Sequence, residues 1–259
     1  MTESVPTSLV LPDLVAREAT PRRSANGLAF ASFGDTRIDA HDLERLVQAV
    51  PDAIAKALNR SAYFFVPLAI SRARAGTLGA KPEEDETLVA SVYTSELSEQ
   101  ATCHRNVLIG ETDAVFISAR LLSDRFALSF EFFINVGHGF VEAAGVPAAF
   151  SELAWRQAKA DLRGETSQDA WESRGAARRS DAEGQLDEKA RSAFFEASFA
   201  DAIAIYLLSL AVDFDYSELR EREYPLLAPL GLAERLRLVA ALFPPNPGYD
   251  FAIRYRRRA

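Results

Sequence analysis

The sequence predicts a mixed α+β fold, in which a helix and several strands come first and helices fill the rest of the chain. Two patterns support this order. Short runs of β-branched and aromatic residues concentrate in the first half, and apolar residues recur at helical spacing over long stretches of the second half. With 259 residues, of which 48% are hydrophobic, the chain can bury a substantial core.

The N-terminal third begins without a strong pattern. Residues 1–39 show weak periodicity and many breakers, so we expect a loosely packed lead-in. Residues 40–59 carry apolar side chains at helical spacing after Asp39, a good N-cap, and Pro51 should kink or split this helix. Residues 63–70 are a strand candidate, and the proline inside them indicates a sheet edge or a strand end.

A polar stretch separates this strand from the next ones. Residues 71–86 hold two glycines, a proline and an acidic run, which is typical of a loop. Residues 88–94 and 113–118 are predicted strands, and residues 107–109 form a short third candidate.

The second half is predicted to be helical. A long helix over residues 124–144 has Ser123 as its N-cap and residues 145–147 as a stop, and a second helix follows. Residues 161–187 are rich in charge, glycine and serine, so we expect a mobile insertion there. Residues 40–259 should form a single domain that includes this insertion. Further helical segments are expected at residues 187–212, 216–223 and 231–242.

Charge and composition exclude several classes of function. The net charge of -8 argues against a general nucleic-acid binder, and the arginines at 254 and 256–258 are interpreted as a frayed, solvated terminus. The longest apolar run, residues 202–212, is about half of what spans a bilayer. One cysteine, Cys103, allows no intrachain disulfide. We therefore expect a cytoplasmic protein with no membrane segment; secretion without a classical signal peptide stays open.

The helix over residues 124–144 carries the main candidate site. His138 lies where an apolar and a polar stripe of this helix meet. Its predicted helical neighbours are the apolar Phe130, Ile134 and Val141 and the polar Glu131, Asn135 and Glu142.

This segment resembles a known metal motif. The zincin metallopeptidases place His-Glu-x-x-His on a helix, so that both imidazoles bind one zinc and the glutamate acts as general base. Ile134-Asn135-Val136-Gly137-His138-Gly139-Phe140 is similar to the form His-Glu-x-Gly-His-x-Phe, with the first two residues replaced. Ala197-Ser198-Phe199-Ala200-Asp201 is similar to Glu-x-Phe-Ala-Asp/Glu, the third-ligand segment of gluzincins such as those resembling the anthrax lethal factor.

The resemblance implies a zincin-like fold, with a small mixed or antiparallel sheet packed on the motif helix, and it also implies lost chemistry. Ile134 has no lone pair for a metal, Asn135 cannot accept a proton from water, and Ala197 removes the third ligand. A catalytic zinc site needs about three protein ligands, and of the expected set only His138 remains. We therefore expect no zinc and no other cofactor.

Other arrangements of these residues stay open. The resemblance implies that Asp201 orients His138, and we expect a hydrogen-bonded pair in the core. A rebuilt metal site would use His138 and Glu142, with Asp201 or Glu196 adding an oxygen. Glu196 is one residue from the ligand position, about 100° round the helix.

A thiol site is the other arrangement. Cys103 and the adjacent His104 point apart on a regular element, so a thiol dyad would pair Cys103 with His138.

The sequence thus predicts a catalytically inactive metallopeptidase-like protein that acts as a binding module for a peptide segment or protein partner. The expected cleft is lined by an edge strand near residues 113–118 and by the helix at 124–144, and binding would occur by strand addition. The alternative function is a metal-dependent or thiol hydrolase with a rebuilt site around His138. An unrelated fold of helices and sheet is the third interpretation; under the family interpretation, residues 134 and 197 face each other across two packed helices.

Overall fold

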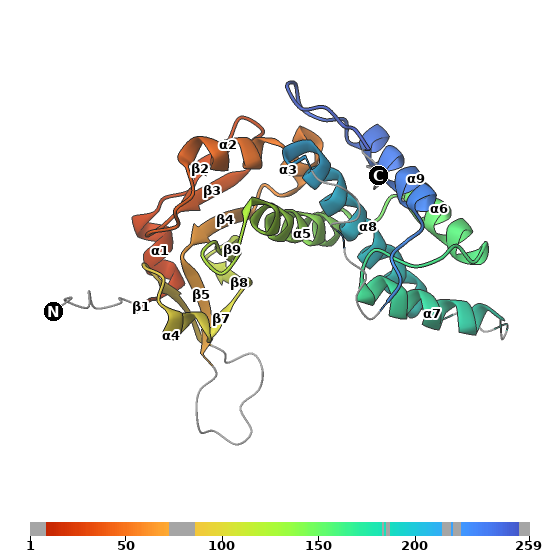
Figure 1. Ribbon diagram of the computed structural model, residues 1–259, viewed down its shortest axis with the longest axis horizontal. Helices are drawn as coiled ribbons and strands as arrows, with labels where there is room; N and C mark the ends of the chain where they lie inside the picture. Colours follow the sequence, from red (N-terminus) through yellow and green to blue (C-terminus); the bar gives the residue numbers. More distant parts are fainter. Residues whose placement is uncertain are drawn as a thin grey trace, which may run out of the picture. The chain divides into compact units, whose positions relative to one another are not determined.

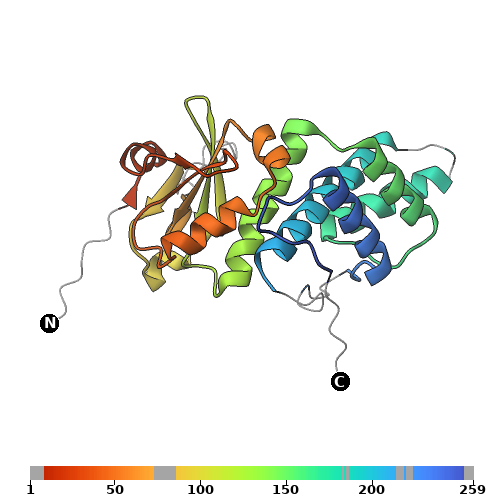
Figure 2. The same cartoon turned by 90° about the horizontal axis from the view of Figure 1, so that it is seen from above.

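The structure is a computed structural model that describes residues 9–72, 86–182, 184, 187–213, 219 and 224–253 (Figure 1; Figure 2). It has the mixed α+β architecture that the sequence predicts. The chain forms two compact units rather than a lead-in followed by one domain. The first unit comprises Met1–Gln48 and Leu58–Glu131, and the second comprises Ala49–Ala57 and Phe132–Ala259.

A five-stranded mixed sheet forms the centre of the first unit. Its strands are β2 (Arg22–Arg23), β3 (Ala29–Ser32), β4 (Ser61–Val66), β9 (Thr112–Ser118) and β8 (His104–Ile109), in this spatial order. The strands β3, β4 and β9 are parallel, and β2 and β8 are antiparallel edge strands. The prediction that residues 113–118 form the edge is therefore wrong: β9 lies between β4 and β8, and β8 is the edge.

A second, antiparallel sheet completes this unit. It contains β1 (Leu9–Val10), β6 (Glu86–Ala90), β5 (Leu68–Arg72) and β7 (Ala101–Thr102), in that order. The predicted strand over residues 63–70 is two strands, because Pro67 lacks the N–H that would continue the ladder from β4 into β5. Most of the predicted loop at 71–86 lies outside the described residues. The short helix α4 (Ser95–Ser98) follows β6.

The first unit has a core to which the N-terminal residues contribute. Phe64 and Phe116 stack with ring centroids 4.9 Å apart, and Val15 and Phe30 are almost fully buried beside or within the sheets. Helix α1 (Pro12–Glu18) supplies Val15. The expectation of a loosely packed lead-in is wrong from residue 9 onward, because these short elements gain their order from the sheets they join.

The predicted helix over residues 40–59 splits at Pro51, as expected, into α2 (Ala40–Gln48) and α3 (Asp52–Ala57). The Asp39 carboxylate caps α2 by accepting from the His41 and Asp42 N–H groups.

The long helix α5 (Arg125–Ala144) begins one residue later than predicted. Its N-cap is Asp124 rather than Ser123, and the Asp124 carboxylate accepts from the Ala127 N–H at 2.7 Å. It ends at Gly145, which has φ +73°, and α6 (Ala148–Lys159) follows.

The expected insertion at residues 161–187 is largely an ordered helix, α7 (Gln168–Ala182), which buries Ala170, Arg174 and Ala177. It packs against α8 (Glu188–Ala211), and α9 (Pro229–Leu242) closes the second unit. The predicted helical segment at 216–223 and the arginine-rich tail lie outside the described residues.

Helix α8 is, in the described part of the chain, the one helix long and apolar enough to cross a membrane. Of its most apolar stretch, 61% is buried within the structure. Burial on that scale is what a core helix of a soluble protein shows.

Candidate functional site

The two helices that carry the motif resemblance pack closely in the second unit. A Cβ atom added to Gly137 of α5 would lie 2.5 Å from the Ala200 carbonyl oxygen of α8. Phe140 and Phe199 meet edge to face close by, with ring centroids 6.3 Å apart. The element that approaches Gly137 closely is therefore α8.

Helix α8 forms because its start is capped and its body is rich in alanine and large apolar residues. The Asp187 carboxylate accepts from the Ala190 N–H at 2.9 Å. Small residues such as Ala200 and Ala204 leave room for neighbouring helices, and both are buried. Asp201 sits one residue beyond the closest approach to α5.

His138 does not occupy the core position that the apolar stripe predicts. Its side chain is exposed, and it forms no hydrogen bond with any described residue. The apolar residues of α5 that are fully buried are Phe132, Phe133 and Val136, which face away from position 138. The prediction of a buried, hydrogen-bonded His138 is therefore wrong.

Asp201 has partners, but they come from the loop before α7. The Thr166 hydroxyl donates to its carboxylate at 2.7 Å, and the Ser167 side chain next to it also lowers the pKa of Asp201. Burial raises the pKa of Asp201, while these two side chains and the nearby charge of His138 oppose the rise and Glu165 adds to it. His138 thus acts on Asp201 through charge, and the expected hydrogen-bonded pair is replaced by a threonine and serine cradle.

The remaining motif positions do not fit zinc. Asn135 is buried, and Ile134 and Ala197 are partly buried. Neither an isoleucine nor an alanine side chain offers a lone pair, so His138 is the one side chain of the ligand pattern that could bind a metal. No group of three or more His, Cys, Asp or Glu side chains among the described residues is placed to hold a metal ion.

Two acidic side chains of the rebuilt-site alternative do come together. Glu142 and Glu196 both line a cavity of about 440 Å³ at the end of α5, where the Ser192 hydroxyl donates to Glu196 at 2.9 Å. Neither His138 nor Asp201 lines this cavity. Of the four residues that a rebuilt metal site would combine, this cavity therefore holds only the two glutamates.

The first unit holds a histidine–carboxylate pair that the sequence pattern does not indicate. His104 Nδ1 of β8 lies 2.6 Å from Glu131 Oε1 of α5, and both side chains are only partly buried. No regular spacing links residues so far apart in the chain, so only the fold brings them together. The neighbouring residue Cys103 is exposed. Partial burial of its thiol raises the pKa of Cys103, and the negative charge of Glu131 raises it further.

The edge strand β8 offers unpaired backbone groups. The Ser118 N–H donates to the Cys103 carbonyl at 2.8 Å, which fixes the alternation of hydrogen-bonded pairs along β8 and β9. The N–H and C=O groups of Asn106 and Leu108 therefore point away from β9. Leu108 is 66% exposed, and no strand in the described ranges pairs with this side of β8.

Comparison with protein-family models, with curated proteins and with solved structures finds no match to this chain. The resemblance of the motif residues therefore stands on the sequence alone.

Proposed function

We propose that this chain is a catalytically inactive, metallopeptidase-like protein that binds an extended segment of a protein partner along the open edge of β8. The observation that carries the proposal is the pair of outward-facing backbone groups at Asn106 and Leu108 on an antiparallel edge strand. The packing of α5 on α8 at Gly137 supports the zincin-like part of the proposal.

Strand addition suits this edge for two reasons. An incoming peptide gains main-chain hydrogen bonds from the exposed N–H and C=O groups, and side-chain selectivity comes from alternate positions along the strand. Leu108 offers apolar area at the strand's end, and His104, held by Glu131, offers a polar contact at its start. We therefore expect a preference for extended segments with an apolar residue opposite Leu108.

The binding test uses a displayed library of random linear peptides, selected on the purified full chain. The best peptide is then titrated by calorimetry against wild type, Leu108→Pro and Leu108→Thr. Proline removes the outward N–H but leaves the β8–β9 ladder intact, whereas threonine changes only the side chain. Loss of an edge hydrogen bond and the accompanying clash should weaken binding at least about 10-fold in Leu108→Pro.

The proposal fails if selected peptides bind Leu108→Pro as tightly as Leu108→Thr and wild type. Asn106→Pro and Asn106→Ala provide the same comparison at the other outward-facing residue of β8. Circular dichroism of each proline variant checks that the sheet is retained.

The inactive state is tested separately. Metal analysis of the purified chain and cleavage of a mixed casein substrate are measured for wild type and His138→Ala. We expect no stoichiometric zinc and equal background cleavage in both. Stoichiometric zinc that is lost together with proteolysis in His138→Ala would show an active metallopeptidase.

A hydrolase remains the second candidate, because His138 is open to solvent and His104 is oriented by a carboxylate as a general base would be. Such an enzyme should hydrolyse an activated ester, for example p-nitrophenyl acetate, above background. Its rate should fall in Cys103→Ser or His138→Ala if these residues form a thiol or rebuilt site. Equal rates in all three proteins would remove this candidate.

A further inference from the structure

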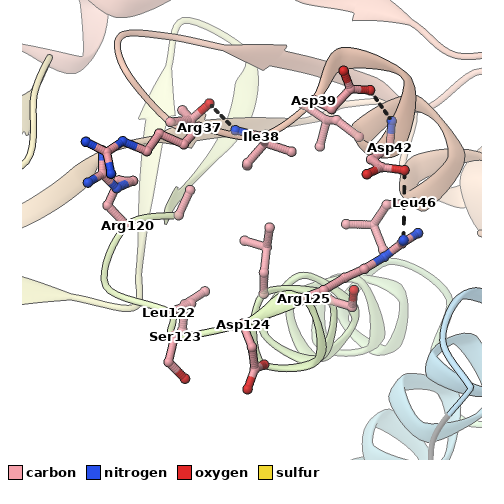
Figure 3. Close-up of a pocket in the computed structure, with 15 residues that line it drawn as sticks. Arg37, Ile38, Asp39, Asp42, Leu46, Arg120, Leu122, Ser123, Asp124 and Arg125 are labelled. Carbon is pink, nitrogen blue, oxygen red and sulfur yellow. Dashed lines mark hydrogen bonds and ion pairs between the residues drawn. The ribbon is translucent and has the colours of Figure 1, made fainter.

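A cavity of about 440 Å³ lies in the first unit at the carboxyl ends of the parallel strands β3 and β9 (Figure 3). One wall comes from the segment that leads from β3 into α2, and the other from the segment that leads from β9 into α5. Ligands of sheets with parallel strands commonly bind outside the carboxyl ends of those strands. The volume lies within the range of small-molecule sites.

The interior of the cavity is mainly aliphatic. Leu43 and Leu46 come from α2, and Leu122 and Leu128 come from the start of α5 or the loop before it. Leu43 and Leu46 are nearly buried, whereas Leu122 and Leu128 keep part of their surface open. A ligand here would therefore place an apolar group among leucine side chains.

One polar atom inside this wall lacks a partner. Ser129 is completely buried and lines the cavity, and its hydroxyl oxygen has no hydrogen-bond partner among the residues that the structure describes. Leaving a buried hydroxyl unsatisfied costs about 1–3 kcal/mol. A ligand or water that reached this hydroxyl would remove that cost.

Charges of both signs surround the opening. Asp42 and Arg125 meet on one side of the cavity, 3.8 Å apart, and Arg37 and Arg120 lie on the opposite side (Figure 3). At 3.8 Å the Asp42 carboxylate and the Arg125 guanidinium are too far apart for a hydrogen bond, and neither side chain has one to another described residue. Each keeps capacity for a ligand group of the opposite charge.

The helix starts themselves are not anion sites. Asp39 and Asp124 cap α2 and α5 with their own carboxylates. Arg37 and Arg120 both contact the Asp35 carboxylate. The lining residues carry three arginines and three aspartates, so a strongly charged ligand of either sign is disfavoured.

We propose that this cavity binds a small zwitterion with an apolar body, that is, a free amino acid with an aromatic or branched side chain. Its carboxylate pairs with Arg125, its ammonium group pairs with Asp42, and its side chain packs against Leu46 and Leu128. The site does not depend on the peptide edge at β8, and the two proposals can fail separately.

The test is calorimetric titration of the full chain with L-phenylalanine, 3-phenylpropanoate and 2-phenylethylamine. These probes share the apolar body and carry both charges, the negative charge alone or the positive charge alone. We expect one saturable site for L-phenylalanine with a Kd below about 1 mM. Each singly charged probe should bind at least about 10-fold more weakly, because it forms only one of the two ion pairs that L-phenylalanine forms with Asp42 and Arg125.

Variants locate the site. Leu128→Trp should fill the cavity and abolish binding, whereas Leu230→Trp, at a leucine that is 79% exposed on α9, should leave it unchanged. Asp42→Asn should remove the preference for L-phenylalanine over 3-phenylpropanoate. The proposal is overturned if no probe binds saturably, if a singly charged probe binds as well as L-phenylalanine, or if Leu128→Trp and Leu230→Trp bind equally.

Discussion

Gly137 of α5 lies so close to Ala200 of α8 that an added Cβ would approach the Ala200 carbonyl oxygen to 2.5 Å. This is a contact with backbone, which cannot rotate away as a side chain can. The glycine therefore sets the distance between the two helices that carry the motif residues.

Gly137→Ala should destabilise the second unit. The alanine gains about 1 kcal/mol of helix propensity, but overpacking against a rigid backbone typically costs 1–3 kcal/mol, or more when helices must separate. We expect a net loss of about 1–2 kcal/mol in the free energy of unfolding, measured by urea denaturation.

Gly175→Ala is the matched control, because this glycine is also helical and the nearest obstacle is the flexible end of Arg179 at 3.4 Å. It should stabilise the chain by about 0.5–1 kcal/mol. Equal effects at the two positions would contradict the close approach of α5 and α8.

Removal of one member of a buried ion cluster should strongly destabilise the second unit. Glu165 and Arg235 are fully buried, and Arg235 binds both carboxylate oxygens of Glu165 at 2.7 and 3.1 Å. Arg174 adds a third contact at 3.3 Å. Glu165→Ala leaves the buried Arg235 guanidinium without its counter-ion and removes the closer of the two carboxylates beside Arg174, so we expect a loss of about 3–5 kcal/mol in denaturant unfolding.

The exposed pair between Lys159 and Asp181 provides the comparison. Asp181→Asn should cost less than about 1 kcal/mol, because water screens both charges. A similar loss in both variants would mean that the Glu165 cluster is not closed to solvent.

Cys103 should react slowly with alkylating reagents although it is exposed. Burial of the thiol and the Glu131 carboxylate both raise its pKa, which lowers the thiolate fraction at neutral pH. Glu131→Gln removes the negative charge, so the rate with iodoacetamide at pH 7.5 should rise about twofold to fivefold. Glu142→Gln, an exposed change on the same helix, should leave the rate as in wild type.

Much of the fold follows from sequence patterns. Pro51 and Pro67 marked the ends of α2 and β4, because proline removes a backbone donor. The predicted helix over residues 187–212 is α8, and the Asp187 carboxylate caps its start by accepting from the Ala190 N–H. These features depend on residues that are close together in the chain, and a single sequence shows such local patterns.

The errors concern relationships between distant segments. Which strand is the edge depends on how β8 and β9 pair, and both have strand patterns. The many charges of α7 predict an insertion, but Arg174 is buried because Glu165 and the carbonyl oxygens of Gly164 and Leu162, which precede α7, accept its hydrogen bonds. The exposed position of His138 could not be predicted, because α5 is apolar over most of its circumference and the sequence does not say which side packs.

The pKa of Asp201 depends on residues that are distant in the sequence, and this dependence should be measurable as a change of stability with pH. Burial raises its pKa in the folded chain above the unfolded value of about 4. The folded state therefore holds the proton more tightly, and the free energy of unfolding falls as the pH rises from the unfolded to the folded pKa. Asp201→Asn abolishes this titration and keeps an acceptor oxygen for Thr166. In urea denaturation at a series of pH values, the variant should gain stability relative to wild type across that window and hold a constant difference above it.

Thr166→Val tests the cause of this behaviour. The Thr166 hydroxyl donates to the Asp201 carboxylate at 2.7 Å and so holds the pKa of Asp201 down. Without this hydrogen bond the pKa of Asp201 should rise further, and the loss of stability should extend to higher pH than in wild type. If Thr166→Val and wild type instead show parallel pH profiles, the hydroxyl does not bind the charged carboxylate, and Asp201 must find its partner elsewhere.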